Sequence, residues 1–300
     1  MFKPMLAPND DPLKTADFFE RLRFPLLCSP KLDGIRMLTI DNKCISRSGK
    51  ELPNSELNGL FSRFALLDGE LIAGLPSEAD VYNKTQSVVM SKDKPADDLT
   101  YFVFDITDGH LCNMPFIERL EIARKRVLEA DTRGIAFVAH NLCETIDDVL
   151  EYEAQALQIG YEGIMMRDPL GKYKHGRGTF NEGLIYKLKR FQDDEAVVID
   201  FIEQTHNTNP SFKDELGKTK RSSSKEGQEA ANTLGAFLVE YQGTKLEIPC
   251  GSLKHAERQY IWDNKSKFLF KELKFRHFPH GKKDRPRMPR FSGWRDPIDK

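Results

Sequence analysis

The sequence predicts an α+β fold in two domains, a larger mixed domain followed by a smaller one built mainly of strands. In the first two thirds of the 300 residues, short apolar strands alternate with a few amphipathic helical segments. In the last third, apolar runs of strand length predominate. A chain of this length can bury two cores of ordinary size. We place the boundary near residues 191–195, FQDDE, and expect domains at residues 1–191 and 192–300.

Two segments of the larger domain have the apolar periodicity of helices. The first is residues 115–130, where apolar side chains recur at helical spacing. The second runs from about residue 146 to residue 159. Thr145 and Asp148 are suited to form a capping box at its start, and Gly160 follows as a stop signal.

The smaller domain contains three apolar runs that we expect to be strands, at residues 197–204, 234–243 and 243–251. One helix is expected near residues 253–263. Residues 205–233 form a long polar segment, which we interpret as a loop that is either functional or disordered. A small strand-rich domain of this kind suggests a partly open barrel, a fold suited to nucleic-acid strands.

Composition places the chain among globular proteins, with 39% hydrophobic and 30% charged residues. No apolar run is long enough for a membrane helix, and the N-terminal residues lack an apolar signal core, so we expect a cytoplasmic protein without membrane contact. The net charge is −1, yet residues 213–225 and 271–290 are basic clusters able to bind phosphates locally. The 5 cysteines lack zinc-knuckle spacing and are expected to be reduced and partly buried.

The first chemistry-bearing segment is KLDGIR, which begins at Lys31 and ends at Arg36. An apolar run precedes it and an alternating strand follows, while Asp-Gly is a tight-turn signal. We expect Lys31 at the start of a strand–turn–strand unit, in which Asp33 shapes the turn. An ordinary hairpin with solvated charges explains the segment equally well when it is considered alone.

The next two segments are SRSGK, which contains Arg47, and LLDGEL, which contains Glu70. A surface turn explains the first one equally well. Glu70 lies inside an apolar strand, where a carboxylate needs a partner. That partner is either a core arginine, in a salt bridge, or a metal ion or ribose hydroxyl, in a binding site.

The remaining three segments are also strands with polar groups in unusual places. YFVFDIT is an aromatic strand that ends in Asp105, and one of its aromatic rings is available to stack on a base. YEGIMMR places Glu162 immediately before an apolar strand. In LIYKLKR, alternation puts Lys187 and Lys189 on one face, where they repel each other unless an anion such as a triphosphate lies between them. A solvated edge strand is the alternative.

The order of these six segments, which span residues 31–190, resembles the covalent nucleotidyltransferase superfamily of ligases and capping enzymes. KLDGIR, LDGEL, EGIMMR and YKLKR match closely, and LGAFLVEY with the tail PRMPRFSGWRDPIDK looks like the barrel domain of bacteriophage DNA ligases. No domain precedes Lys31, which suggests the minimal two-domain bacteriophage type. The resemblance implies an ATP-grasp-like adenylation domain with antiparallel sheets and flanking helices, followed by an OB-fold β-barrel domain.

The resemblance also implies a function and its participants. The chain is expected to be an ATP-dependent DNA ligase that seals nicks in double-stranded DNA, as a monomer, in replication, repair and recombination. ATP is the nucleotide, and magnesium is the metal, with manganese as a substitute. If the chain is phage-encoded, it acts in the host cytoplasm.

Residue roles carry over position by position from the resemblance. Lys31 matches the nucleophile that accepts AMP, and Ser29 the residue at the adenine edge. Arg36, Arg47 and Glu70 match the residues that hold the sugar and phosphates. Phe104 matches the aromatic that stacks on adenine, and Lys187 and Lys189 match the phosphate-binding lysines. Glu70 and Glu162 are the expected magnesium ligands. A lysine nucleophile must lose its proton, which nearby cations and a dry pocket favour.

Three further expectations concern the smaller domain. The family's C-terminal pattern, Arg-x-Asp-Lys, is matched imperfectly by Arg295-Asp296 and Asp299-Lys300, so Arg290 and Arg295 are both candidates to orient pyrophosphate. Residues 191–195 are expected to be a flexible joint between the domains. Four basic residues of the long polar segment are candidates for contact with the DNA backbone: Lys218, Lys220, Arg221 and Lys225.

Three other functions compete with this one. An RNA-capping guanylyltransferase shares the lysine hairpin and the glutamate strand, but EGIMMR and YKLKR favour ligases. An RNA ligase more often has a small hydroxyl residue after the glycine of its first motif. A non-catalytic OB-fold DNA-binding protein would not need the intact set of Lys31, Glu70, Glu162, Lys187 and Lys189.

Overall fold

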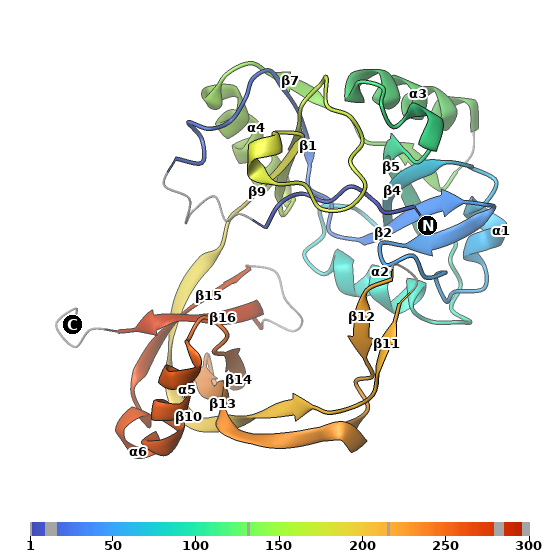
Figure 1. Cartoon of the computed structure of the whole chain (residues 1–300). Coiled ribbons are helices and arrows are strands. Elements are labelled where there is room, and N and C mark those ends of the chain that lie inside the picture. The colour runs from blue at the N-terminus through green and yellow to red at the C-terminus, as the bar shows by residue number, and fades with distance from the viewer. Residues whose placement is uncertain (1, 10–16, 131–132, 215–216, 279–284, 296–300) are drawn as a thin grey trace. The chain divides into compact units, whose positions relative to one another are not determined.

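The computed structural model describes residues 2–9, 17–130, 133–214, 217–278 and 285–295. The chain divides into two compact units, Met1–Arg190 and Phe191–Lys300. Figure 1 labels the elements of both, and each unit has its own sheets and its own apolar core. Most strand pairs are antiparallel and helices flank the sheets, which confirms the predicted α+β class.

The first unit contains two sheets. One has five strands in the order β3-β2-β4-β5-β6, and only β5 and β6 run parallel within it. Helices α1, α2 and α3 pack against its strands. The bounds are β2 Ile35–Ile40, β3 Lys43–Ser46, β4 Leu67–Ala73, β5 Leu99–Ile106, β6 Ile135–Phe137, α1 Leu57–Phe61, α2 Val81–Val89 and α3 Phe116–Ala130.

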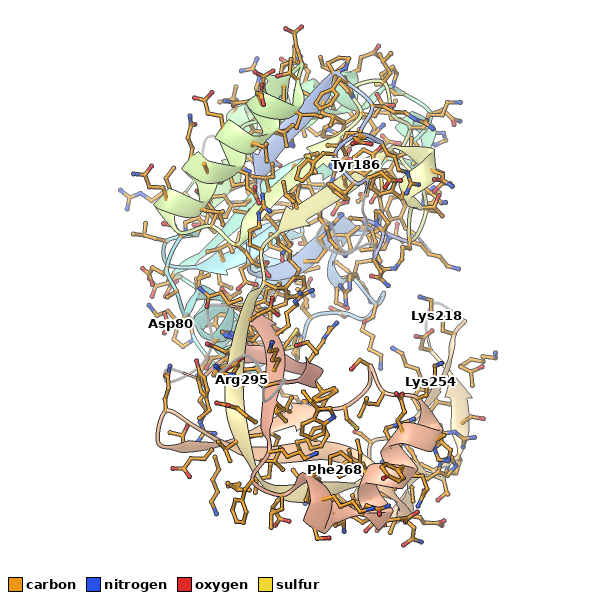
Figure 2. The ribbon with its side chains drawn as sticks, turned by 90° about the vertical axis from the view of Figure 1, so that its left-hand side faces the viewer. Asp80, Tyr186, Lys218, Lys254, Phe268 and Arg295 are labelled. Carbon is orange, nitrogen blue, oxygen red and sulfur yellow. The ribbon has the colours of Figure 1, made fainter. Side chains whose placement is uncertain are left out.

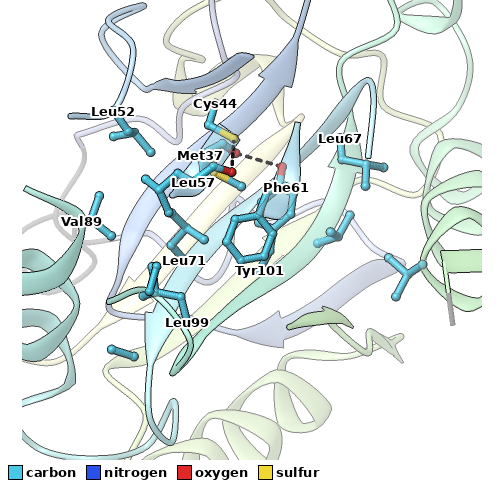
Figure 3. Close-up of a cluster of buried hydrophobic side chains, with 14 of the residues drawn as sticks. Met37, Cys44, Leu52, Leu57, Phe61, Leu67, Leu71, Val89, Leu99 and Tyr101 are labelled. Atoms are coloured by element: carbon cyan, nitrogen blue, oxygen red, sulfur yellow. Dashed lines mark hydrogen bonds between the residues drawn. The ribbon is translucent and has the colours of Figure 1, made fainter. Parts of the chain in front are cut away.

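The core of this sheet is apolar and closely packed (Figure 3). Met37, Leu71 and Tyr101 are all fully buried within it. The two polar groups drawn with partners are satisfied inside the core, since the Tyr101 hydroxyl donates to the Met37 carbonyl and the Cys44 thiol donates to the Leu57 carbonyl. Burial of these side chains stabilises the sheet that carries half of the predicted motifs.

The second sheet of this unit has four antiparallel strands in the order β7-β1-β8-β9. Helix α4 packs against β1, β7 and β8, and its apolar face joins a core that includes Leu26, Ile164 and Leu188. The bounds are β1 Leu26–Pro30, β7 Asn141–Cys143, α4 Ile146–Ile159, β8 Gly163–Arg167 and β9 Ile185–Lys189.

Both helices predicted in this unit are confirmed. α3 begins one residue after Pro115, and α4 has the predicted bounds. Thr145 and Asp148 form the expected capping box, and Gly160 ends the helix with a φ of 109°. Glycine adopts that conformation without the steric cost that a Cβ would bring, so the stop signal was reliable.

The strand–turn–strand expectation for KLDGIR needs a correction. β1 and β2 do flank the segment, but they belong to different sheets and do not pair with each other. The chain therefore crosses from the four-stranded to the five-stranded sheet at residues 31–34. Because the crossover places Lys31 beside both sheets, the ordinary-hairpin alternative is excluded.

The second unit is built on a five-stranded antiparallel sheet in the order β14-β13-β10-β15-β16. Five strands is also the number in an OB-fold. The expected strands and the helix near residues 253–263 are confirmed. The bounds are β10 Gln192–Asn207, β13 Gln228–Tyr241, β14 Thr244–Pro249, α5 His255–Asp263, α6 Lys265–Phe268, β15 Glu272–Phe278 and β16 Arg287–Trp294.

Two expectations for this unit are wrong. Residues 205–233 are not a loop without structure: β10 and β13 extend into them, and β11 (Ser211–Lys213) pairs with β12 (Thr219–Arg221). The expected flexible joint is mostly strand, since β10 begins at Gln192 and pairs with β15. The polar faces of these strands hid them from a search for apolar runs.

Between β9 and β10 only Arg190 and Phe191 lie outside strands. The Arg190 guanidinium pairs with Glu153 of the first unit, and the Phe191 ring packs 4.4 Å from that of Phe278 in the second. Each residue of the link is thus attached to its own unit. Any joint in the chain is confined to this short stretch.

Two expectations from composition are also tested. All five cysteines are free and buried, as predicted. Burial is the main reason that the pKa of the Cys28 thiol lies well above its usual value. In the part of the chain that the structure describes, no helix has the length and apolar character needed to cross a membrane.

Candidate active site

A cavity of about 310 Å³ lies in the first unit, and strands of both its sheets contribute to the lining. Its size is within the range of small-molecule sites. Eight of the nine residues predicted from the sequence line this cavity: Ser29, Lys31, Arg36, Arg47, Glu70, Phe104, Lys187 and Lys189. The ninth, Glu162, contacts two of the lining lysines.

Lys31, Glu162 and Lys189 form what we call the lysine cluster. The backbone N–H of Lys31 donates to the Gly163 carbonyl at 2.8 Å, which fixes the residue beside β8. The Lys31 amine donates to one Glu162 carboxylate oxygen, and the Lys189 amine lies 3.2 Å from the other. The carboxylate thus holds two amines at the cavity.

The charge state of Glu162 follows from its two partners. Burial alone would raise the pKa of this carboxyl, but attraction to Lys31 and Lys189 and their hydrogen bonds outweigh it, and the pKa falls to about 2. Glu162 is therefore ionised at neutral pH and is a weak base. It is suited to hold an ammonium group in place.

Strand β9 presents its side chains as its alternation predicted. Tyr186 and Leu188 are buried in the core, while Lys187 and Lys189 line the cavity. An anion was expected between the two lysines, and the Glu162 carboxylate supplies a negative charge to one of them, Lys189. β9 is an edge strand of its sheet, as the alternative expected, but both lysines border a cavity instead of open solvent.

Arg36 forms an ion pair with Asp68, whose carboxylate is fully buried while the Arg36 side chain is 15% exposed. Its Nε and Nη2 atoms donate to the two carboxylate oxygens at 2.6 Å each. Burial would lower the pKa of Arg36, but Asp68 raises it above its ordinary value, so the group stays charged. The arginine partner expected for Glu70 is thus taken by Asp68.

Glu70 lies opposite Arg36 in the β2–β4 pairing, lines the cavity and forms no ion pair with the described residues. Burial raises its pKa to about 7, against the attraction of Arg36 and Lys31. A half-buried carboxyl without a cation partner is suited to a metal ion or a hydroxyl group, which is the binding alternative left open by the sequence.

Two guanidinium groups lie close to the ring of Phe104. Arg36 is 4.6 Å from its ring centroid and Arg167 is 5.4 Å away. Its neighbour Tyr101 is fully buried in the core, as expected for most aromatics of this strand. A base that stacks on Phe104 must share the ring with these cations or displace one of them.

Asp105, the residue after Phe104 in β5, is a second fully buried carboxylate besides Asp68. It accepts hydrogen bonds from Arg119 at 3.0 and 3.2 Å and from Arg167 at 2.6 Å. Burial is the main reason that the pKa of Arg167 is lowered, and Asp105 opposes that shift. We call Arg36, Asp68, Asp105, Arg119 and Arg167 the arginine cluster.

The sequence interpretation missed several residues of the site. Asp68 had a signal, because alternation along LLDGEL puts it on the same face as Glu70. Others came from segments without a recognised motif and line the cavity or support it: Met5, Ala7, His140, Tyr173 and Arg177. Only the fold brings these distant segments to the same cavity.

His140 is a partly buried polar residue that lines this cavity. Its Nδ1 lies 2.8 Å from the Val138 carbonyl, which only accepts, so Nδ1 carries the proton. Burial and then the charge of Arg167 lower the pKa of His140 to about 4. The ring is therefore neutral at pH 7, and its Nε2 has no hydrogen-bond partner among the described residues.

The C-terminal candidates lie in the second unit. Arg295 contacts Glu195 and lies 3.3 Å from Glu272, so its charge is used inside that unit. Arg290 is exposed on β16. The acidic and basic residues after Arg295, which are Asp296, Asp299 and Lys300, lie outside the described residues.

The basic residues of the β11–β12 hairpin are all exposed. Lys220 pairs with the buried Asp214 at 3.0 Å, and the Arg221 guanidinium donates to the Asn209 carbonyl. Lys218, labelled in Figure 2, and Lys225 make no side-chain ion pair with the described residues. These two charges are the ones most available for an external anion.

No group of three acidic, histidine or cysteine side chains with metal-binding geometry occurs within the described ranges. Two carboxylates, Glu70 and Glu162, remain as candidates. This fits magnesium, which is usually held by one or two carboxylates together with substrate phosphates and water.

A family model described as "ATP dependent DNA ligase domain" matches residues 4–189. A DNA ligase of Haemophilus influenzae is 29% identical over 175 residues, which are 57% of this chain and 60% of that protein. A DNA ligase of African swine fever virus is 24% identical over 107 residues, 35% of this chain and 26% of that one. The chain thus matches less than two thirds of the length of these relatives.

Solved structures similar to this chain include a Chlorella virus DNA ligase-adenylate, with 29% identity, 98% of each chain covered and a TM-score of 0.53. A structure from a study of Lig E DNA ligases has 20% identity, covers 98% of this chain and 100% of its own, and has a TM-score of 0.72. The second likeness concerns the fold alone.

Proposed function

The chain belongs to the family of ATP-dependent DNA ligase domains, and from this premise we propose that it seals nicks in double-stranded DNA through an adenylate carried on Lys31. One observation supports this proposal above the others. The Lys31 amine borders a cavity that both sheets line with cations, including Arg36, Arg47, Lys187 and Lys189. Such a cavity suits a nucleoside triphosphate and the positioning that phosphoryl transfer requires.

The proposed reaction has three steps. The Lys31 nitrogen attacks the α-phosphorus of ATP, the bond to pyrophosphate breaks, and an N–P bond forms while the amine loses a proton. An oxygen of the 5′-phosphate at the nick then attacks the same phosphorus, and the N–P bond breaks. In the last step the 3′-hydroxyl attacks the 5′-phosphate, AMP leaves, and the hydroxyl proton is released.

We assign the nucleotide contacts to the residues that line the cavity. Arg36, Arg47 and Glu70 hold the sugar and phosphates, Phe104 stacks on adenine, and Ser29 contacts its edge. Lys187 and Lys189 bind the phosphates that become pyrophosphate. When ATP is bound, its phosphates replace Glu162 as the partner of Lys189, while Glu162 keeps its contact with Lys31.

Glu162 is assigned an orienting role toward Lys31. A carboxyl with a pKa of about 2 is too weak a base to take a proton from an ammonium group. Its contact with the amine instead fixes the direction of the nucleophile. Magnesium, held by Glu70 and Glu162, would neutralise charge on the phosphates.

The two units correspond to the two proposed domains, an adenylation domain at residues 1–191 and an OB-fold domain at residues 192–300. The exposed cations of the β11–β12 hairpin support DNA-backbone contact by the second domain. Arg290, which is exposed, is favoured over Arg295 as the residue that orients pyrophosphate, because Glu195 and Glu272 already bind Arg295.

The proposal is tested by incubating the protein with magnesium and either α-labelled ATP or α-labelled GTP. We expect adenylate to remain on the denatured chain, at Lys31 by mass spectrometry, and guanylate not to. Guanylate on the chain would favour a capping enzyme. A comparison of nicked DNA with nicked RNA then separates a DNA ligase from an RNA ligase.

A matched pair of lysine variants completes the test. Lys31→Ala should abolish both labelling and sealing while DNA binding persists. Lys43→Ala removes an exposed lysine of the same unit, paired only at 3.4 Å with Glu51, and should leave both activities unchanged. Equal sealing by the two variants would reject Lys31 as the nucleophile.

A further inference from the structure

Tyr173 lies between β8 and β9, in a segment to which the proposed reaction assigns no role. Its ring is 4% exposed, and its hydroxyl has two partners from distant parts of the sequence. The hydroxyl donates to the Asp68 carboxylate at 2.7 Å and accepts from the Met5 backbone N–H at 3.1 Å. It therefore joins strand β4 to the N-terminal segment.

The Tyr173 hydroxyl is the third hydrogen-bond donor to Asp68, a fully buried carboxylate. One Asp68 oxygen accepts from Arg36 Nε, and the other accepts from both Arg36 Nη2 and the Tyr173 hydroxyl. Burial, reinforced by the charge of Asp68, raises the pKa of Tyr173 well above its ordinary value, so the hydroxyl keeps its proton and can donate. Without it, one buried acceptor position would be unsatisfied.

The contact with Met5 fixes a wall of the cavity. Met5, Leu6 and Ala7 line it. Leu6 exchanges backbone hydrogen bonds of 2.9 and 2.8 Å with residues 176 and 178, a few positions after Tyr173. Arg36 Nη2 also approaches the Met5 carbonyl at 3.4 Å. The wall and the arginine are thus tied to the same hydroxyl.

We propose that Tyr173 is a positioning residue for nucleotide binding, whose hydroxyl sets Arg36, through Asp68, and the Met5–Ala7 wall in the geometry that receives ATP. This inference rests on the proposed function of the cavity. Arg36 is held by two hydrogen bonds on one side of its fork, so the orientation of Asp68 determines where the remaining N–H groups point. Displacements of about 1 Å in such groups cost as much as 100-fold in rate.

The chain contains a matched control for this hydroxyl. Tyr186, labelled in Figure 2, is 1% exposed in the same unit, and its hydroxyl has no hydrogen-bond partner among the described residues. Tyr186→Phe and Tyr173→Phe remove the same atom from equally buried rings. Only the second change removes hydrogen bonds, so their difference isolates the network.

The experiment measures the rate of Lys31 adenylylation against ATP concentration in the wild type and both variants. Tyr173→Phe should raise the KM for ATP about 10-fold and change kcat less than 3-fold. It should also reduce the rise in melting temperature that ATP produces, a readout that needs no turnover. Tyr186→Phe should match the wild type in all three quantities.

A second pair of variants separates positioning from general loosening of the fold. If Tyr173 acts through Arg36, then adding Tyr173→Phe to Arg36→Lys should raise the KM less than 3-fold further. Additive effects, or an unchanged KM in Tyr173→Phe, would overturn the inference alone. A wild-type chain that takes no label from ATP would refute the proposed function as well.

Discussion

The lysine cluster and the arginine cluster each contribute two side chains to the same cavity but differ in how their charges are held. In the lysine cluster, the side chains of Lys31 and Lys189 are 21% and 20% exposed, and they share one carboxylate. In the arginine cluster, Asp68 and Asp105 are fully buried. The partly exposed Lys189 amine can exchange Glu162 for a substrate phosphate, whereas the buried carboxylates hold their arginines in one place. We infer that the first cluster carries the chemistry and the second holds the geometry.

The largest effect is expected where the arginine cluster is broken. Asp105→Asn leaves Arg119 and Arg167 buried without a compensating charge, so the free energy of unfolding should fall by about 3 to 5 kcal/mol. Urea unfolding of the first unit measures this loss. Asp41→Asn, at an exposed turn with a φ of 51°, is the control and should change stability by less than about 0.5 kcal/mol. A similar loss of stability in both variants would contradict the structural role of the arginine cluster.

A change in the lysine cluster should affect the rate of adenylylation more than the stability of the fold. Glu162→Gln removes the charge that holds the Lys31 and Lys189 amines, so adenylylation of Lys31 should slow about 100-fold. Because the two amines are partly exposed and can be solvated, the free energy of unfolding should fall less than in Asp105→Asn, by about 1 to 3 kcal/mol. Single-turnover labelling and thermal melting measure the two quantities. Strong destabilisation with normal labelling would show that the lysine cluster supports the fold and not the chemistry.

Glu70 is attracted by one residue of each cluster, Arg36 and Lys31. Its titration should make stability depend on pH. Its pKa is raised from 4.5 to about 7 by burial, so the folded state binds its proton more tightly than the unfolded state does. Its contribution to stability is full below pH 4.5 and is lost as the pH rises through 7. Glu70→Gln should therefore gain stability relative to the wild type between pH 5 and pH 8, by roughly 1 to 3 kcal/mol.

The pH test compares urea midpoints of the wild type and Glu70→Gln across that range. The other titrating groups are common to both proteins, so the difference isolates Glu70. A constant difference would show that burial does not shift this carboxyl. The variant should also lose affinity for ATP, because the amide cannot serve as an ionised ligand for a metal ion.

The smallest effect is expected at Lys218, in the turn of the β11–β12 hairpin, and at Lys225, which follows the hairpin; both are exposed. Lys218→Ala with Lys225→Ala should weaken binding to nicked DNA and make the slope of log affinity against log salt shallower by about 2. A matched removal of Lys92 and Lys125, exposed lysines of the first unit, is the control. Equal slopes for both double variants would argue against the hairpin as a DNA contact.

The outcome of the sequence interpretation differs between local and distant features. Helix α4 was predicted with its bounds because the capping box, the apolar periodicity and Gly160 all lie within one short segment. The structured hairpin in residues 205–233 was missed because exposed strands such as β11 and β12 have no apolar face to detect. The pairing of β1 with β8 rather than β2 was also beyond local pattern, since it joins residues far apart in the chain.

The sequence by itself determined eight of the side chains that line the cavity. Lys31, Glu70 and the lysines of β9 were marked by charged groups within or beside apolar strands, where burial is costly unless a partner is supplied. Phe104 was marked by the family resemblance, as the aromatic that stacks on adenine. Only the tertiary structure decided who those partners are. The choice of Asp68 for Arg36 follows from the pairing of β2 with β4 in one sheet. The choice of Glu162 for Lys31 and of Tyr173 for Asp68 depends on segments far apart in the chain coming together. Contacts across such distances follow from how whole elements pack, and no local sequence pattern encodes them.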